Sequence, residues 1–108
     1  WVLPKGIREP ELSYAESAAK EAWEEAGARG RVGAKPLGKY RYTKWGADCR
    51  VKVFPLAVED LADEWEESYR EREWLAPKAA AKRLQPKAVG KLVRKLGKRL
   101  KKGGSGLP

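Results

Sequence analysis

The segment from Ser13 to Gly27 constrains the fold more than any other part of the chain. Ser13 precedes Glu16 by three residues, which is the spacing of a capping box and predicts the start of a helix. Gly27 is the residue type that commonly ends a helix, so this one should run to about Ala26. One face carries only small residues: Ala15, Ala18, Ala19, Ala22 and Ala26. Such a stripe predicts a helix whose backbone lies close to a sheet.

A second face of the same helix carries Glu21, Glu24 and Glu25. Positions three and four apart share a helix face, so these carboxylates should crowd together. Lys20 lies four residues before Glu24 and relieves part of the repulsion, whereas Glu21 and Glu25 have no basic residue at helical spacing. Two interpretations follow: a solvated acidic face, or a set of oxygen ligands for a hard divalent cation.

The residues before the helix favour the second interpretation. Residues 1–6 read Trp-Val-Leu-Pro-Lys-Gly, an apolar strand end followed by a turn, and a polar loop then leads to the helix. Loop, helix and glutamates together resemble the signature of the Nudix hydrolase family, Gly-x5-Glu-x7-Arg-Glu-U-x-Glu-Glu-x-Gly-U, where U is a bulky apolar residue. The matching positions are Gly6, Glu21, Glu24, Glu25 and Gly27. The chain departs from the signature at Leu12, Lys20, Ala22 and Ala28.

The resemblance implies a chemistry for these residues. Glu21, Glu24 and Glu25 would bind Mg²⁺, with Mn²⁺ as the alternative, and the Gly6 carbonyl would be a further ligand. Glu24 and Glu25 would be the catalytic residues in hydrolysis of a phosphoanhydride bond. The implied fold is α+β, a Nudix-like α/β/α sandwich with a mixed sheet.

The resemblance extends over residues 1 to about 85. The segments 36–42, 51–56 and 72–77 follow the order seen in bacterial relatives of the diphosphoinositol-polyphosphate and diadenosine-polyphosphate hydrolases. The implied substrate is therefore a nucleoside- or inositol-linked polyphosphate. Nudix domains usually have about two strands before the Pro-Lys-Gly turn. Because this chain opens on Trp1 and contains no methionine, we expect it to be N-terminally truncated.

Binding of a polyphosphate requires cations near the metal. Lys5 and Arg8 flank Gly6 and are the first candidates, followed by Arg41 and then by Lys44 and Arg50. Each of them also fits an ordinary surface charge. Three aromatic residues could stack on a base, but aromatic residues at alternating strand positions more often form core or cross-strand contacts (Tyr40, Tyr42 and Trp45). A general base outside the helix would be one of three glutamates that the sequence does not separate: Glu67, Glu71 and Glu73.

Composition excludes several other classes of function. The chain has no histidine and a single cysteine, Cys49, so it cannot use a Ser-His-Asp or Cys-His arrangement or form an internal disulfide. Zinc is disfavoured for the same reason. No apolar run reaches the ~18 residues that a membrane helix needs, and no targeting signal is evident. A cytoplasmic location is the default expectation.

The remaining pattern predicts further elements. We expect a short strand at 29–34, a hairpin of 39–45 and 49–58 around residues 46–48, and an acidic connection at 59–68. Alternation predicts a strand at 69–75, Pro77 begins a helix that ends near Leu84, and Pro86 separates it from a helix over 87–102. Residues 103–106, Gly-Gly-Ser-Gly, should be flexible.

Charge is unevenly distributed within the net +9. Residues 1–75 hold 13 Lys and Arg against 15 Asp and Glu, whereas residues 76–108 hold 11 Lys and Arg and no acid. We therefore divide the chain into a Nudix-like domain (1–85), a basic amphipathic helix (86–102) and a tail (103–108). The helix could bind nucleic acid or an anionic membrane, which gives the alternative function of a catalytically impaired polyanion-binding module. The simpler interpretation, which we prefer, packs its apolar stripe on the sheet with the lysines in water. Oligomeric state is not predicted.

Overall fold

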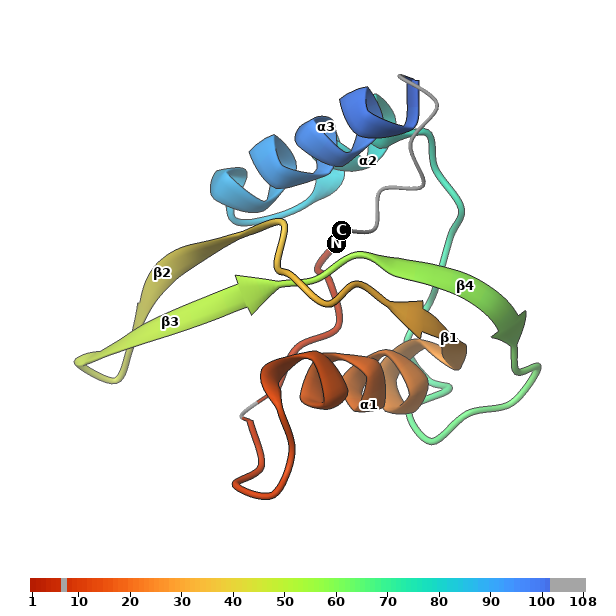
Figure 1. The fold of residues 1–108 in the computed structure, drawn as a ribbon, viewed down its shortest axis with the longest axis horizontal. Helices are drawn as coiled ribbons and strands as arrows, with labels where there is room; N and C mark the ends of the chain where they lie inside the picture. Colours follow the sequence, from red (N-terminus) through yellow and green to blue (C-terminus); the bar gives the residue numbers. More distant parts are fainter. Residues whose placement is uncertain (7, 102–108) are drawn as a thin grey trace.

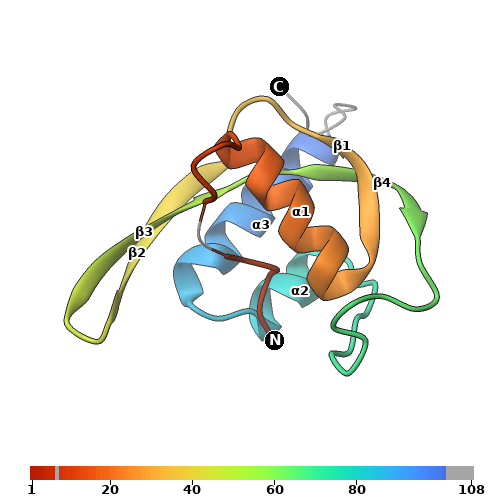
Figure 2. The same cartoon turned by 90° about the horizontal axis from the view of Figure 1, so that it is seen from below.

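The computed structural model describes residues 1–6 and 8–101, and its elements form three layers (Figure 1). Helix α1 (Tyr14–Ala26) covers one side of the strands, and helices α2 (Pro77–Arg83) and α3 (Lys87–Lys101) cover the other (Figure 2). The α+β class is thereby confirmed, with helices on both sides of the strands. The predicted flexible segment 103–106 and the side chains of Tyr42 and Lys44 lie outside the described part of the structure.

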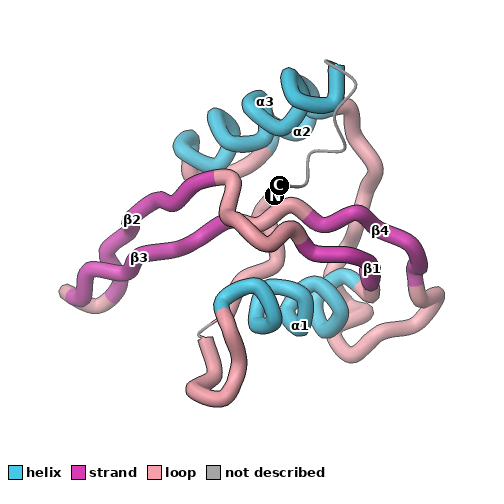
Figure 3. The backbone as a smooth tube through the Cα atoms, viewed as in Figure 1, coloured by secondary structure: helices cyan, strands magenta, loops and turns pink. Residues whose placement is uncertain are grey.

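The strands form one long antiparallel ribbon that is interrupted in the middle (Figure 3). Strand β1 (Ala28–Val32) pairs with β4 (Leu56–Leu61), and β2 (Gly38–Lys44) pairs with β3 (Ala47–Val53). Two backbone bonds bridge the interruption: the Gly33 amide donates to the Pro55 carbonyl at 2.9 Å, and the Leu37 amide donates to the Val53 carbonyl at 2.7 Å. The expected mixed sheet is therefore wrong for the described strands. The chain runs through β1 and β2, reverses at one hairpin turn and returns through β3 and β4. Both strand pairs are therefore antiparallel.

Three element predictions are corrected. The strand expected over 49–58 is two strands, because Pro55 has no amide to donate and the ladder breaks at Phe54 and Pro55. The strand expected over 69–75 is irregular, since its side chains bind the end of α1 instead of a neighbouring strand. Residues 1–6 also form no strand; at their start, the Trp1 carbonyl accepts a bond from the Gln85 amide at 3.1 Å.

Helix α1 has the ends that the sequence predicts. The Glu16 amide donates to Ser13 Oγ at 3.1 Å, and the Ser13 amide donates to Glu16 Oε1 at 2.8 Å. Gly27 is left-handed (φ 62°), and its amide donates to the carbonyls of Ala22 and Trp23. The capping box and the glycine end are both confirmed, because they depend only on residues within one helix.

The hairpin turn lies one residue earlier than predicted. Trp45 and Gly46 both have positive φ (52° and 76°), the backbone of a two-residue turn that matches the twist of the flanking strands. The turn is therefore Trp45-Gly46, and residues 47 and 48 belong to β3. No helix within the described residues has the length and apolar character to cross a membrane.

The best-buried apolar residues lie between the ribbon and the C-terminal helices. Val89 is 1% exposed, and Leu37 and Ala81 are also buried. The backbone of α3 approaches α2 so closely at Gly90 that a Cβ there would lie 2.7 Å from the Ala81 carbonyl oxygen. Lys95 Nζ donates to the Leu37 carbonyl at 3.0 Å. The apolar stripe of α3 therefore packs mainly on α2 and to a smaller extent on the start of β2, whereas we expected it to pack on the sheet.

Candidate metal and phosphate site

Gly6 and Glu21 meet where the N-terminal segment passes α1. A Cβ added at Gly6 would overlap the Glu21 carboxylate. A side chain at position 6 would therefore push this carboxylate away. The first glycine and the first helix glutamate of the predicted site are thus adjacent in space.

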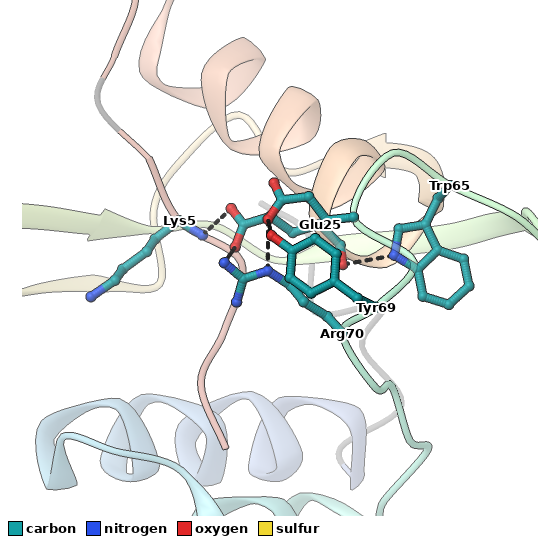
Figure 4. A network of polar contacts seen from close by, with 6 residues as sticks. Lys5, Glu25, Trp65, Tyr69 and Arg70 are labelled. Carbon is teal, nitrogen blue, oxygen red and sulfur yellow. Dashed lines mark hydrogen bonds and ion pairs between the residues drawn. The ribbon is translucent and has the colours of Figure 1, made fainter.

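Glu25 is the second contact between this segment and the helix. Its side chain is 9% exposed, and its Oε2 accepts a hydrogen bond from the Lys5 amide at 3.1 Å across 20 residues of sequence (Figure 4). Arg70 Nη2 lies 3.8 Å from its Oε1. The sequence offered Glu25 no basic partner at helical spacing. The structure supplies one from the segment that follows β4.

Glu24 interacts with Lys20 as the spacing predicts, at 3.8 Å between Nζ and Oε1. Lys20 also forms an ion pair and hydrogen bond with Glu9 of the preceding loop. The chain has Leu12 where the Nudix signature has its upstream glutamate, so Glu9 provides a carboxylate for the basic residue from a different position. The loop is thereby tied to the helix that carries the glutamates.

Burial and the neighbouring carboxylates together change the protonation of Glu21. Burial, a hydrogen bond with Glu25 and the negative charges of Glu25, Glu24 and Glu67 raise the pKa of Glu21 to about 7. Hydrogen bonds from Arg70 and Tyr69 hold the pKa of Glu67 below its ordinary value. Of the three candidate glutamates outside the helix, Glu67 is the one whose charge raises the pKa of Glu21 within the described residues.

The candidate donor atoms fit a hard divalent cation in their chemistry, but the described side chains are not arranged around one point. All candidate ligands are oxygen atoms, and the glycine leaves room for the Glu21 carboxylate beside the backbone. Within residues 1–6 and 8–101, no three Asp, Glu, Cys or His side chains converge as a metal site requires. Glu25 contacts Arg70 and the Lys5 amide instead.

Comparison with known proteins shows a group of phosphohydrolases to which the chain is similar. No family model matches the chain. Over 88 residues it is 38% identical to diphosphoinositol polyphosphate phosphohydrolase 3-alpha of Mus musculus, which covers 79% of this chain and 52% of the relative. It is also 36% identical over 88 residues to the 3-beta protein of Homo sapiens and to phosphohydrolase 2 of Rattus norvegicus. Each of these alignments covers 79% of this chain, and they cover 52% of the human protein and 48% of the rat protein. The chain is a partial Nudix homologue. The chain spans about half the length of the curated relatives it matches.

The Nudix homologue has a cationic face on its hairpin that the sequence analysis captured only in part. Lys39 lies directly opposite Lys52, and Arg41 lies opposite Arg50. Like charges in direct cross-strand positions destabilise a sheet. Arg41, 66% exposed, has only a 4.0 Å ion pair with Asp48. Lys39 and Lys52 were not predicted; the signal for them is a pair of basic residues two positions apart in each strand.

Arg8 and Lys52 converge on Tyr14 at the start of α1. The Arg8 guanidinium lies 4.8 Å from the ring centroid and Lys52 Nζ lies 3.9 Å from it. A cavity of about 1170 Å³ opens between α1 and the ribbon, and its lining includes Gly6, Glu21 and these two cations. The Nudix homologue therefore places the Glu21 carboxylate and these two cations on the walls of one cavity. Trp45, a candidate for base stacking, lies apart at the hairpin turn and is 94% exposed.

Segment 62–72 holds the end of α1 through two residues that the sequence did not indicate as part of the site, Trp65 and Arg72. Trp65 Nε1 donates to the Glu25 carbonyl at 3.0 Å. Arg72 donates to the carbonyls of Ala26 and Ala62 at 2.8 and 2.6 Å, and its guanidinium lies 4.1 Å from the Trp65 ring centroid. One signal was available: the last turn of α1 contains no basic residue, so its free carbonyls require donors from elsewhere.

Proposed function

We propose that this Nudix homologue hydrolyses a phosphoanhydride bond in a nucleoside- or inositol-linked polyphosphate, using Mg²⁺ or, as the alternative, Mn²⁺. The observation that carries the proposal is the meeting of the N-terminal segment with the helix glutamates. Gly6 lies against the Glu21 carboxylate, and the Lys5 amide binds Glu25. The relatives' names, diphosphoinositol polyphosphate phosphohydrolases, support the substrate class.

Glu21, Glu24, Glu25 and the Gly6 carbonyl are the residues that would hold the metal. A divalent cation bound there supplies neutralisation of phosphate charge and a lowered pKa of bound water. Burial and then the neighbouring carboxylates raise the pKa of Glu21, and a bound cation would offset the repulsion between these carboxylates. Binding of the cation would also require Glu25 to give up its ion pair with Arg70.

Glu24 and Glu25 are the proposed catalytic residues, accepting the proton of the attacking water. Glu67 is close enough to influence the cluster, but Arg70 and Tyr69 bind it and lower its pKa. A lowered pKa makes a carboxylate a weaker base at neutral pH. Glu73 is committed to an ion pair with Arg83 at 3.1 Å.

Lys5, Arg8 and Arg41 are the proposed substrate-binding residues, and Lys52 joins them. Arg8 and Lys52 line the same cavity as Glu21. Arg41 extends this surface along the hairpin beside Arg50. In this proposal residues 1–85 carry the hydrolase site, and residues 86–102 are a separate basic element.

The test is Mg²⁺-dependent hydrolysis by the full chain of a diphosphoinositol polyphosphate and a diadenosine polyphosphate. Glu24→Gln/Glu25→Gln should lower the rate at least about 100-fold, because it removes proton acceptors and metal ligands. Glu59→Gln/Glu66→Gln removes the same charge at two exposed positions outside the site and should leave the rate unchanged. Equal rates for the two double variants would refute the proposal. Substrate binding without hydrolysis would favour the impaired binding module.

A further inference from the structure

Five basic residues form a continuous stripe along the outer face of α3. They are spaced four, three, four and three residues apart, which places them on one side of a helix: Lys87, Lys91, Arg94, Lys98 and Lys101. All five are exposed, and no ion pair or side-chain hydrogen bond joins any of them to another described residue. At 1.5 Å per residue the stripe is about 21 Å long. We call it the α3 stripe.

The arrangement is unfavourable for the isolated protein. Like charges three or four residues apart destabilise a helix, and four such pairs follow one another here. The first turn of α3 has no acidic residue, so Lys87 lies unbalanced at the positive end of the helix. Residues 76–108 contain no Asp or Glu that could compensate. A bound polyanion would remove this repulsion.

The packing of α3 indicates which polyanion fits. Most of its apolar side, including Val89 and Leu92, is directed to α2 and the start of β2, and the exposed Leu100 near its end leaves too little apolar surface to enter a lipid bilayer. Residues 76–101 contain no aromatic side chain, so the surface has no platform on which unpaired bases could stack. A regular row of charges remains, which suits the phosphates of a duplex.

We propose that the α3 stripe binds the phosphate backbone of a nucleic-acid duplex without reading its sequence. Helix α3, which carries the stripe, lies across the ribbon from α1, which carries the glutamates (Figure 1). This binding is therefore independent of the proposed hydrolysis. Each phosphate contact should contribute about −0.9 to the slope of log affinity against log salt concentration.

The experiment measures fluorescence anisotropy of the full chain with a DNA duplex, an RNA duplex of the same sequence and a single strand, from 50 to 200 mM NaCl. With about four contacts the duplex slope is about −3.6, a loss of about 150-fold in affinity over this range. The single strand should bind more weakly. The two duplexes distinguish DNA from RNA as the source of the phosphates.

Arg94→Gln and Arg99→Gln form a matched pair. Both remove one arginine charge from α3, but Arg94 belongs to the stripe and Arg99 does not. Arg94→Gln should reduce the magnitude of the slope by about 0.9, and Arg99→Gln should leave it unchanged. Equal slopes for the two variants would mean diffuse attraction and would overturn the proposal.

Two further arms complete the test. Lys91→Glu/Lys98→Glu should weaken duplex binding at least tenfold, while Glu24→Gln/Glu25→Gln should leave it intact, so this proposal and the hydrolase can fail separately. Co-sedimentation with vesicles of phosphatidylserine and phosphatidylcholine tests the membrane. Stripe-dependent vesicle binding without duplex binding would assign the surface to lipid and refute the assignment to nucleic acid.

Discussion

Replacing Gly6 with alanine should separate function from folding in this Nudix homologue. The new Cβ would overlap the Glu21 carboxylate, which is the mobile end of a long side chain and can rotate away. Removing a glycine stabilises a protein by about 0.4–1 kcal/mol where the backbone allows alanine. The cost of moving the carboxylate offsets this gain, so the free energy of unfolding should change by less than about 1 kcal/mol.

The effect on activity should be much larger. The displaced carboxylate belongs to a proposed metal ligand, and a shift of about 1 Å at a catalytic site can cost about 100-fold in rate. Gly46→Ala is the matched control. Gly46 has φ 76° and a Cβ there would meet nothing within 4 Å, so alanine should cost about 1–2 kcal/mol through backbone strain alone. It should leave the rate of the folded protein unchanged.

The assay combines urea unfolding with Mg²⁺-dependent release of phosphate from a diphosphoinositol polyphosphate. We expect Gly6→Ala to lose rate with little loss of stability, and Gly46→Ala to show the reverse. Wild-type activity in Gly6→Ala would show that the position of the Glu21 carboxylate is irrelevant. The reasoning about the site would then be wrong.

Further predictions concern the capping box, the end of α1 and the outside glutamate. Ser13→Ala should cost about 1 kcal/mol in urea unfolding, because the Glu16 amide loses its acceptor. Hydrogen bonds from Ser13 lower the pKa of Glu16. The stability that ionised Glu16 contributes is therefore present above its ordinary pKa and is lost as the pH falls through its lowered pKa. In Ser13→Ala, an NMR titration should show the pKa of Glu16 raised. Arg72→Lys should lower the free energy of unfolding by about 1.5–3 kcal/mol, since one ammonium cannot replace the guanidinium between the Ala26 and Ala62 carbonyls; unchanged stability would contradict this. Glu67→Gln should keep the hydrolysis rate within about tenfold of wild type, because Glu67 is a weak base. A larger loss of rate would indicate that Glu67 is the general base.

The sequence predicted α1 well because its signals are local. Ser13, Glu16 and Gly27 each act within one turn of the helix end that they define. The same holds for Pro77 at the start of α2 and for the separation of α2 from α3 near Pro86. These elements need no information about distant parts of the chain.

The errors arise where distant contacts decide the structure. Residues 69–75 alternate like a strand, but Arg72 instead extends to the carbonyls at the end of α1. Trp45 adopts a positive φ that its residue type rarely favours, so the turn lies at Trp45 and Gly46 and not at the predicted residues 46–48. For the site, the spacing of Glu21, Glu24 and Glu25 predicted crowding, and the pKa of Glu21 agrees. The pairing of Glu25 with Arg70 joins segments that no local pattern connects.

The central claim is that Glu21, Glu24 and Glu25 bind a divalent cation. Isothermal titration of the full chain with Mg²⁺ tests it most directly, because the readout does not depend on substrate or turnover. We predict saturable Mg²⁺ binding by the wild-type chain and none by Glu21→Gln/Glu24→Gln/Glu25→Gln, with circular dichroism showing that the variant keeps its helices. Equal Mg²⁺ binding by both proteins, or none by the wild type, would contradict the account.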